Sequence, residues 1–289
     1  MSDEKPVVGV VGCGFVGNAV ATGFAPIAQI LRCDRDTTRG PHSLQSVADK
    51  ADVIFICVPT PTSSQTGVQN QSCLQSVVGR LADLTEGRNP IVVIKSTVEP
   101  GTTDRLALLY PWLTFVANPE FLTERTAVED FKHPAHVVVG GPTCATQRVL
   151  NLYNAMINEQ LLCCNECWDL QTTALEAEMI KYASNCFFAA KIAFFNELRQ
   201  IAFAAGANFE TIRHGIIASG WVHPMHTQAP GPDGRLGFGG KCFPKDIAAF
   251  ATYARKIGVH PTMLEAAIKK NLELRPERDW EQIEGAITL

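Results

Sequence analysis

The chain has 289 residues, of which 46% are hydrophobic and 19% charged, an ordinary globular composition with room for two domains. No apolar run approaches the ~20 residues that a membrane helix needs. A net charge of −4 gives no electrostatic reason to expect binding to nucleic acid or to a membrane surface. The polar, acidic start is unlike a secretory signal, so we expect a cytoplasmic protein.

The first strand and turn form a motif for binding a dinucleotide. A β-branched run at residues 7–11 is followed directly by the pattern GxGxxG, and then by an apolar helix over residues 18–24. In such a context the glycines allow a tight turn, close approach to a pyrophosphate and close packing of helix on strand. The start of the helix would offer N–H groups to the phosphates. These cofactor-binding positions are Gly12, Gly14, Phe15, Val16 and Gly17.

An acidic residue follows the second predicted strand, residues 29–33. Asp34 comes twenty-two residues after Gly12, where a carboxylate binds the adenosine ribose 2′-hydroxyl, so NAD is favoured over NADP. Arg32 and Arg35 flank Asp34 and weaken that preference. The alternative is a solvated Asp at the end of a strand.

Further apolar runs alternate with helical stretches and predict an α/β fold with a doubly wound, Rossmann-like parallel sheet. Ligand chemistry in such sheets gathers at the carboxyl ends of the strands. The predicted strands cover residues 53–58, 91–95, 115–117, 137–139 and, last, about 160–164, and the polar stretch 63–72 is interpreted as a surface loop.

The segment after the strand at residues 115–117 suggests paired carboxylates. Asn118 and Pro119 suit the N-cap and first turn of a short helix, which would place Glu120 and Glu124 one turn apart. Two such carboxylates could position a water or act as general bases. The alternative is a solvated acidic edge.

The character of the chain changes near residue 168. Cys163, Cys164 and Cys167 suggest a metal site, but no second ligand pair stands at a zinc spacing, so we expect no metal.

A helix without Pro or Gly is predicted over residues 170–205. We therefore expect a dinucleotide-binding domain over residues 1–168, a helical substrate and dimerisation domain over 169–275, and a polar tail over 276–289.

Two polar residues share one face of the long helix. Lys181 and Asn185 are four residues apart, and polar groups turned to the interior are costly unless they have partners, so they would mark a site. The alternative is a partly exposed helix on which both side chains are solvated.

A cysteine near residue 242 has the surroundings of a nucleophile. Cys242 stands between Lys241 and Lys245, and nearby ammonium groups favour the thiolate. Pro244 suits a first helical position, which would place Cys242 at a helix N-terminus, where the positive end of the dipole favours the thiolate further. The alternative is a loop with a chance cysteine.

Six motifs in this order make the chain resemble the nucleotide-sugar 6-dehydrogenase family, which includes UDP-glucose and GDP-mannose 6-dehydrogenases. The resemblance runs from about residue 7 to 274. The motifs are GxGxxG at residues 12–17, VPTP at 58–61, KSTV at 95–98, NPEFLTE at 118–124, KYASN at 181–185 and GFGGKCFPKD at 237–246.

The resemblance implies NAD-dependent four-electron oxidation of the C6 hydroxymethyl of a nucleotide sugar, most simply UDP-glucose to UDP-glucuronate, through a thiohemiacetal and a thioester on the cysteine. It also implies a homodimer paired along the long helix. By position, the catalytic residues would be Cys242, Lys181, Asn185, Asp246, Glu120, Glu124 and Thr97. Further cofactor-binding residues would be Pro59, Thr60 and Lys245, and the substrate-binding residues Phe121, Leu122, Trp221, Gly239 and Lys241.

Two departures from the family leave other functions open. The chain looks like a short form without the third, C-terminal domain, and Trp221 stands where an Arg is expected. A two-electron β-hydroxyacid dehydrogenase would share the layout but needs no nucleophilic cysteine. A non-catalytic NAD-binding or regulatory homologue is the third possibility.

Overall fold

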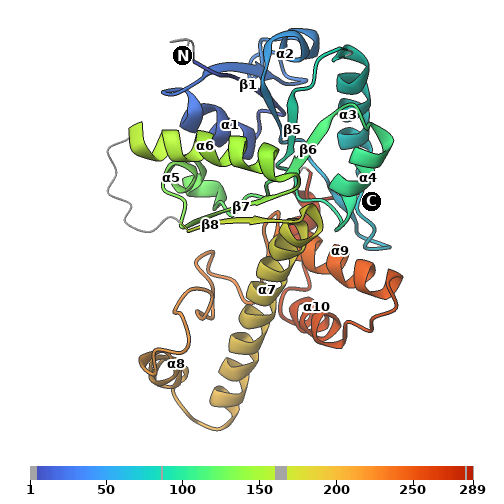
Figure 1. Ribbon diagram of the computed structural model, residues 1–289. Helices are drawn as coiled ribbons and strands as arrows, with labels where there is room; N and C mark the ends of the chain where they lie inside the picture. The colour runs from blue at the N-terminus through green and yellow to red at the C-terminus, as the bar shows by residue number, and fades with distance from the viewer. Residues whose placement is uncertain (1–4, 86, 160–167, 284, 289) are drawn as a thin grey trace. The chain divides into compact units, whose positions relative to one another are not determined.

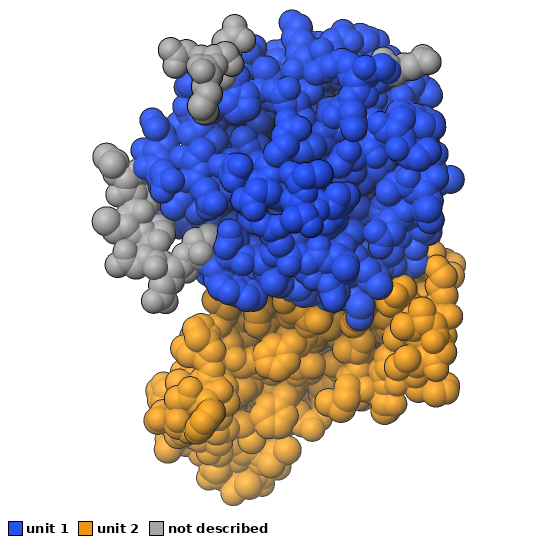
Figure 2. Space-filling view, in the orientation of Figure 1, with its two compact units in different colours: residues 1–60, 71–181 blue, residues 61–70, 182–289 orange. Residues whose placement is uncertain are grey.

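The computed structural model describes residues 5–85, 87–159, 168–283 and 285–288 (Figure 1). The chain forms two compact units, coloured separately in Figure 2. Unit 1 comprises residues 1–60 and 71–181, and unit 2 comprises residues 61–70 and 182–289.

Unit 1 is built on a seven-stranded sheet with the order β2-β1-β3-β5-β6-β7-β8. All neighbouring pairs are parallel except β6 and β7, which meet antiparallel at Ala117 and Gly140. The strands are β1 (Val7–Val11), β2 (Gln29–Cys33), β3 (Val53–Ile56), β5 (Ile91–Ile94), β6 (Thr114–Ala117), β7 (His136–Gly140) and β8 (Trp168–Thr172).

Side chains of the central strands alternate between two cores, one on each face of the sheet. Phe55 and Val93 belong to one core, whereas Ile54 and Val92 belong to the other. This alternation explains why the central strands are apolar throughout, and it confirms the doubly wound fold. The first face is covered by α1 (Phe15–Phe24), α5 (Ala127–Lys132) and α6 (Thr143–Glu159), and the second by α2 (Leu44–Lys50), α3 (Ser72–Leu84) and α4 (Thr102–Leu109) (Figure 1).

Unit 2 is mainly helical. The long helix α7 (Ala174–Ala204) begins in unit 1 and continues into unit 2, which also contains α8 (Phe209–Ala218), α9 (Phe243–Lys256) and α10 (Thr262–Leu274). Its small core joins the middle of α7 to α9 and α10 through Ala189, Phe238, Ile247 and Ala267.

The C-terminal segment differs from the sequence-based expectation. The expected polar tail is part of unit 2: it contains the 3₁₀ helix η2 (Asp279–Gln282) and strand β9 (Ile287–Thr288), and Trp280 is only 7% exposed. β9 pairs with β4 (Thr62–Ser63), which lies at the start of the expected surface loop and overlaps it only at Ser63. Burial of one large aromatic and a short strand pairing thus attach the described residues of this segment to unit 2.

The strand expected near residues 160–164, like Cys163, Cys164 and Cys167, lies outside the described residues. The last described strand of the seven-stranded sheet is β8, and α7 begins at Ala174 rather than at residue 170.

Substitution of the glycines in the turn after β1 is expected to lower stability by different amounts. A Cβ on Gly17 would lie 1.9 Å from the carbonyl oxygen of Gly12, whereas a Cβ on Gly14 would meet no atom within 4 Å. We expect Gly17→Ala to lower the free energy of unfolding by about 2 kcal/mol or more, because backbone must move to admit the methyl group. The matched control Gly14→Ala should cost less than about 1 kcal/mol. Urea denaturation measures both values, and equal losses would contradict this account of the turn.

Candidate active site

The glycine-rich turn of unit 1 has room for a phosphate group. Gly12 has φ +88°, and a Cβ there would lie 2.7 Å from the carbonyl oxygen of Cys57, so only glycine fits. Gly14 is the N-cap of α1, and Phe15 and Val16 are the first residues of the helix. No side chain caps this N-terminus and no acidic residue lies in its first turn, so its N–H groups can bind an anion in the open space beside Gly14.

Asp34 lies against this turn. Its carboxylate accepts hydrogen bonds from the backbone N–H of Cys13 at 2.5 Å and of Asp36 at 2.9 Å. Arg32 is engaged with α1, because its guanidinium donates to Asn18 Oδ1 at 2.9 Å and to Thr22 Oγ1 at 3.4 Å. Asp34, which is expected to bind the adenosine ribose, is therefore held beside the glycine turn that is expected to bind the phosphates. These residues fit a dinucleotide.

The loops after β3 and β5 are joined by a hydrogen bond. Thr60 is buried, and its hydroxyl donates to the carbonyl of Thr97 at 2.6 Å. Pro59, beside it, is exposed. The sequence placed these three residues in cofactor binding and catalysis, and within unit 1 they lie together at the carboxyl edge of the sheet.

A buried ion pair joins α7 to the loop after β6. Lys181 Nζ lies 2.9 Å from Glu120 Oε1, and both side chains are at most 6% exposed. Burial alone would raise the pKa of Glu120, but the Lys181 ammonium and the N–H of Leu122 outweigh it and hold that pKa below its ordinary value. Lys181 also lies 5.5 Å from the ring centroid of Phe121. The alternative that Lys181 is solvated is therefore wrong.

One turn earlier on α7, Glu178 binds the start of α4. Its carboxylate accepts from Gly101 N at 2.5 Å, and from Thr103 N at 2.8 Å and Thr103 Oγ1 at 2.7 Å. Burial raises the pKa of Glu178 in spite of these donors. A carboxylate at a helix N-terminus is favourable, and here it ties α7 to the loop that carries Thr97.

The expected short helix at residues 118–124 is absent, and Glu120 and Glu124 do not share a helical face. Residues 118–123 are not helical, and Glu124 is an exposed residue at the start of the 3₁₀ helix η1 (Glu124–Thr126). Asn118 cannot cap a helix because its amide is used inside unit 1. Its Nδ2 donates to Val138 O, and its Oδ1 accepts from Lys95 Nζ and Tyr153 OH.

That interior network contains a buried lysine which sequence reasoning missed. Lys95 Nζ contacts Asn118 Oδ1 at 3.0 Å and Tyr153 OH at 2.9 Å. Burial lowers the pKa of Lys95 to about 8. The KSTV motif gave a signal, but its partner Tyr153 is 58 residues away and nothing local indicates it.

In unit 2, Cys242 is the N-cap of α9, as expected, and Pro244 lies in the first turn. Cys242 is half-buried. Among the other described cysteines, burial raises the pKa of Cys13 to about 11 and that of Cys57 to about 12, and it also raises the pKa of Cys186. Those three thiols are therefore poor nucleophiles at neutral pH.

A second buried polar group stands in the first turn of α9. Lys245 and Asp246 form an ion pair, and Asn185 Nδ2 donates to Asp246 Oδ2 at 2.6 Å. All three are at most 7% exposed, so Asn185 is not wet. Because the charge of Lys245 is paired with Asp246, the positive charge expected beside Cys242 comes mainly from Lys241 and the helix N-terminus.

Lys245 also lines a cavity of about 180 Å³ within unit 2. Thr62 lines the same cavity, and its buried hydroxyl has no hydrogen-bond partner among the described residues. Sequence reasoning missed this cavity because Trp280 and Ile287 in its wall belong to the segment expected to be a tail.

The remaining substrate candidates fall into both units. Phe121 and Leu122 are half-buried in unit 1, and Gly239 and Lys241 are half-buried in unit 2. Trp221 is 92% exposed and does not pack in a core.

Within the described ranges, no group of three or more His, Cys, Asp or Glu side chains is arranged to hold a metal ion. No described helix combines the length and the apolar character required to cross a membrane.

Comparison with known proteins agrees with this arrangement. The NAD binding domain of the UDP-glucose/GDP-mannose dehydrogenase family matches residues 34–157, and the central domain of that family matches residues 175–273. The two matches together take in more than half of the chain.

Individual relatives point the same way. The UDP-glucose 6-dehydrogenase of Rickettsia typhi is 34% identical over 229 residues, which are 78% of this chain and 50% of that protein. A solved UDP-glucose dehydrogenase from Pyrobaculum islandicum aligns with a TM-score of 0.81 at 28% identity, over 96% of this chain and 70% of the other. A 3-hydroxyisobutyrate dehydrogenase from Mycobacterium tuberculosis, at 15% identity, shares the fold with a TM-score of 0.75 over 95% of both chains.

The chain spans about half the length of the curated relatives it matches. With both domain matches in place, the chain belongs to the UDP-glucose/GDP-mannose dehydrogenase family and contains its NAD-binding domain.

Proposed function

We propose that this chain is an NAD-dependent dehydrogenase that oxidises the C6 hydroxymethyl of a nucleotide sugar to a carboxylate, with UDP-glucose as the first candidate. The observation that carries the proposal is Cys242 at the N-terminus of α9, next to the buried Asn185–Asp246 pair. A thiol at this position suits covalent catalysis on an aldehyde. The two-electron alternative would leave such a cysteine without a role.

The proposed chemistry uses Cys242 to hold the aldehyde. The C6 alcohol loses a proton and a hydride, and the Cys242 thiolate adds to the aldehyde carbon. The thiohemiacetal loses a second hydride to become a thioester, and water then displaces the thiolate. One sugar, two NAD and one water thus give one carboxylate, two NADH and three protons. NAD, held by the glycine turn and Asp34, would accept each hydride.

The other residues have proposed roles in charge and proton transfer. The side chains of Lys181 and Asn185 would stabilise oxyanions, and the bond to Asp246 orients Asn185 for this role. By family position, Glu120 would assist with water and proton transfers, and the ammonium of Lys181 keeps it ionised. By family position, Thr97 and Glu124 would help to place the water.

A panel of nucleotide sugars tests the proposal. We expect NADH to appear with one of them at a ratio of two NADH per sugar, and NAD to be preferred over NADP by at least tenfold because Asp34 would repel a 2′-phosphate. A ratio of one would support a two-electron enzyme, and no NADH with any sugar would support a non-catalytic NAD-binding protein.

In the same assay Cys242→Ala should abolish turnover, while NAD binding to unit 1 persists. Unimpaired NADH production by that variant would rule out the thioester route.

Trp221 is proposed to contact the base of the nucleotide. An indole that is 92% exposed is available for stacking, which is worth ~1–3 kcal/mol per base in nucleic-acid sites. We expect Trp221→Ala to raise the KM for the nucleotide sugar tenfold or more with little change in NAD affinity. Trp221→Phe, which keeps an aromatic face, serves as the control. An unchanged KM in Trp221→Ala would remove Trp221 from the substrate-binding set.

We further propose a homodimer that covers part of α7. Phe187, Phe194 and Ile201 follow one another at seven-residue intervals and are 63%, 58% and 59% exposed. Residues at this spacing lie on one side of a helix, so they form an exposed apolar stripe of the kind that partners cover. Light scattering should give a dimer at micromolar concentration and a monomer for Phe194→Glu. Lys269→Glu, which adds the same carboxylate at an exposed position of α10, should leave the dimer intact. A monodisperse wild-type monomer would defeat this proposal.

A further inference from the structure

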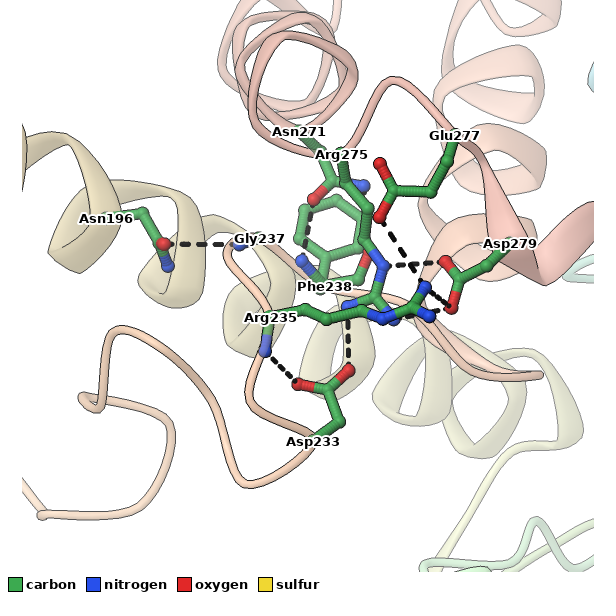
Figure 3. A network of polar contacts seen from close by, with 9 residues as sticks. All are labelled: Asn196, Asp233, Arg235, Gly237, Phe238, Asn271, Arg275, Glu277 and Asp279. Carbon is green, nitrogen blue, oxygen red and sulfur yellow. Dashed lines mark hydrogen bonds and ion pairs between the residues drawn. The ribbon is translucent and has the colours of Figure 1, made fainter.

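The stretch just before the cysteine is held by two asparagine side chains (Figure 3). Gly237 N donates to Asn196 Oδ1 at 3.1 Å. Phe238 N donates to Asn271 Oδ1 at 2.6 Å, and Asn271 Nδ2 donates back to Phe238 O at 2.9 Å. The buried amide of Asn271, on α10, thus satisfies both backbone groups of Phe238, which a loop would otherwise leave unpaired.

Arg275, directly after α10, ties the start of the same loop to the C-terminal segment. It is 3% exposed. Its Nε and Nη2 bind the two carboxylate oxygens of Asp279, each at 2.6 Å, and its Nη1 binds Asp233 Oδ2 at 2.8 Å. A buried, bidentate guanidinium is fixed in direction as well as in place. Arg235 adds partly exposed ion pairs to Glu277 and Asp279 at the rim of this network, and its backbone N donates to Asp233 Oδ1 at 3.1 Å (Figure 3).

These contacts explain two of the glycines near Cys242. A Cβ on Gly239 would lie 2.6 Å from Arg275 Cζ, and a Cβ on Gly237 would lie 2.4 Å from Asn271 Oδ1. Gly237 also has φ +71°. Gly239 is therefore required for space, and Gly237 for both space and conformation.

The chain is fixed again immediately after the cysteine. Asp246 N donates to Cys242 O at 3.0 Å in the first turn of α9, and the side chain of Asp246 is bonded to Asn185 on α7. Only Gly240 and Lys241 separate the anchored Gly239 from Cys242. The position of the thiol at the helix N-terminus is thus determined from both sides.

We propose that Asn271 and Arg275 are positioning residues for Cys242: by anchoring Phe238 and enclosing Gly239, they hold the thiol at the N-terminus of α9. The proposal rests on the nucleophilic role of Cys242 given above. Release of the loop would let Cys242 move from the positive end of the helix dipole, and the thiolate would then be less favoured.

The reactivity of the thiol tests this without reference to turnover. The probe is iodoacetamide, with the Cys242 peptide followed by mass spectrometry over a pH series. The exposed Cys144 on α6 of unit 1 serves as the internal reference. We expect Asn271→Ala to slow alkylation of Cys242 about tenfold relative to Cys144 at neutral pH. The pH midpoint of the Cys242 reaction should rise by about one unit.

Two further variants separate positioning from folding. Gly239→Ala keeps every hydrogen-bonding group and only crowds the Arg275 guanidinium, so it should give the same shift if Asn271→Ala fails to fold. Lys270→Ala, on the same helix, removes ion pairs to Glu197 and Glu273 that do not touch the loop, and should leave Cys242 unchanged.

Unaltered rate and midpoint for Cys242 in folded Asn271→Ala or Gly239→Ala would overturn the positioning role. If the wild type oxidises no nucleotide sugar but the shift occurs, the positioning role stands and the proposed function fails. If turnover is found without the shift, only the positioning role fails.

Discussion

Helix α7 buries four polar side chains, and the site depends on each of them finding a partner. Glu178 binds the start of α4 and Lys181 binds Glu120 in unit 1, whereas Asn185 binds Asp246 and Asn196 binds Gly237 in unit 2. Each polar group left without a partner in such a place would lower the free energy of unfolding by about 1–3 kcal/mol. With 100° and 1.5 Å per residue, the four positions lie within a stripe about 60° wide and about 27 Å long. In unit 1 this stripe therefore holds the start of α4 and the Glu120 loop, and in unit 2, taken by itself, it holds the start of α9 and the Gly237 stretch.

The charges of the site are organised in pairs. Lys181 with Glu120 and Lys245 with Asp246 are buried ion pairs, so neither unit places an isolated buried charge at these positions. Breaking such a pair by removal of one partner is far more costly than the net value of the pair, because the other charge stays buried. This pairing also changes the explanation for Cys242, since Lys245 is balanced by Asp246. The N-terminus of α9 is then a more important reason to expect a thiolate than the two flanking lysines.

Much of the fold and part of the site could be predicted from the sequence because their determinants are local. The glycine turn, Asp34 and the start of α9 at Cys242 each depend on a few consecutive residues. The helix expected at residues 118–124 was wrong because Asn118 is bonded to Lys95, Tyr153 and Val138, contacts that no local pattern reveals. Trp280 and the pairing of β4 with β9 were missed for the same reason.

The polarity of α7 has a consequence for how its surface is interpreted. In unit 2 it buries the large apolar side chains of Tyr182 and Phe195 as well as Asn185 and Asn196, while Phe187 and Phe194 are 63% and 58% exposed. From helix geometry, these two phenylalanines point about 160–180° away from Glu178. The helix thus carries large apolar side chains on its exposed side as well as on its buried side, so hydrophobicity alone does not decide which side packs against the core. Substitutions that made this outer stripe polar for solubility would therefore remove an apolar surface that this part of the helix presents to a second protein.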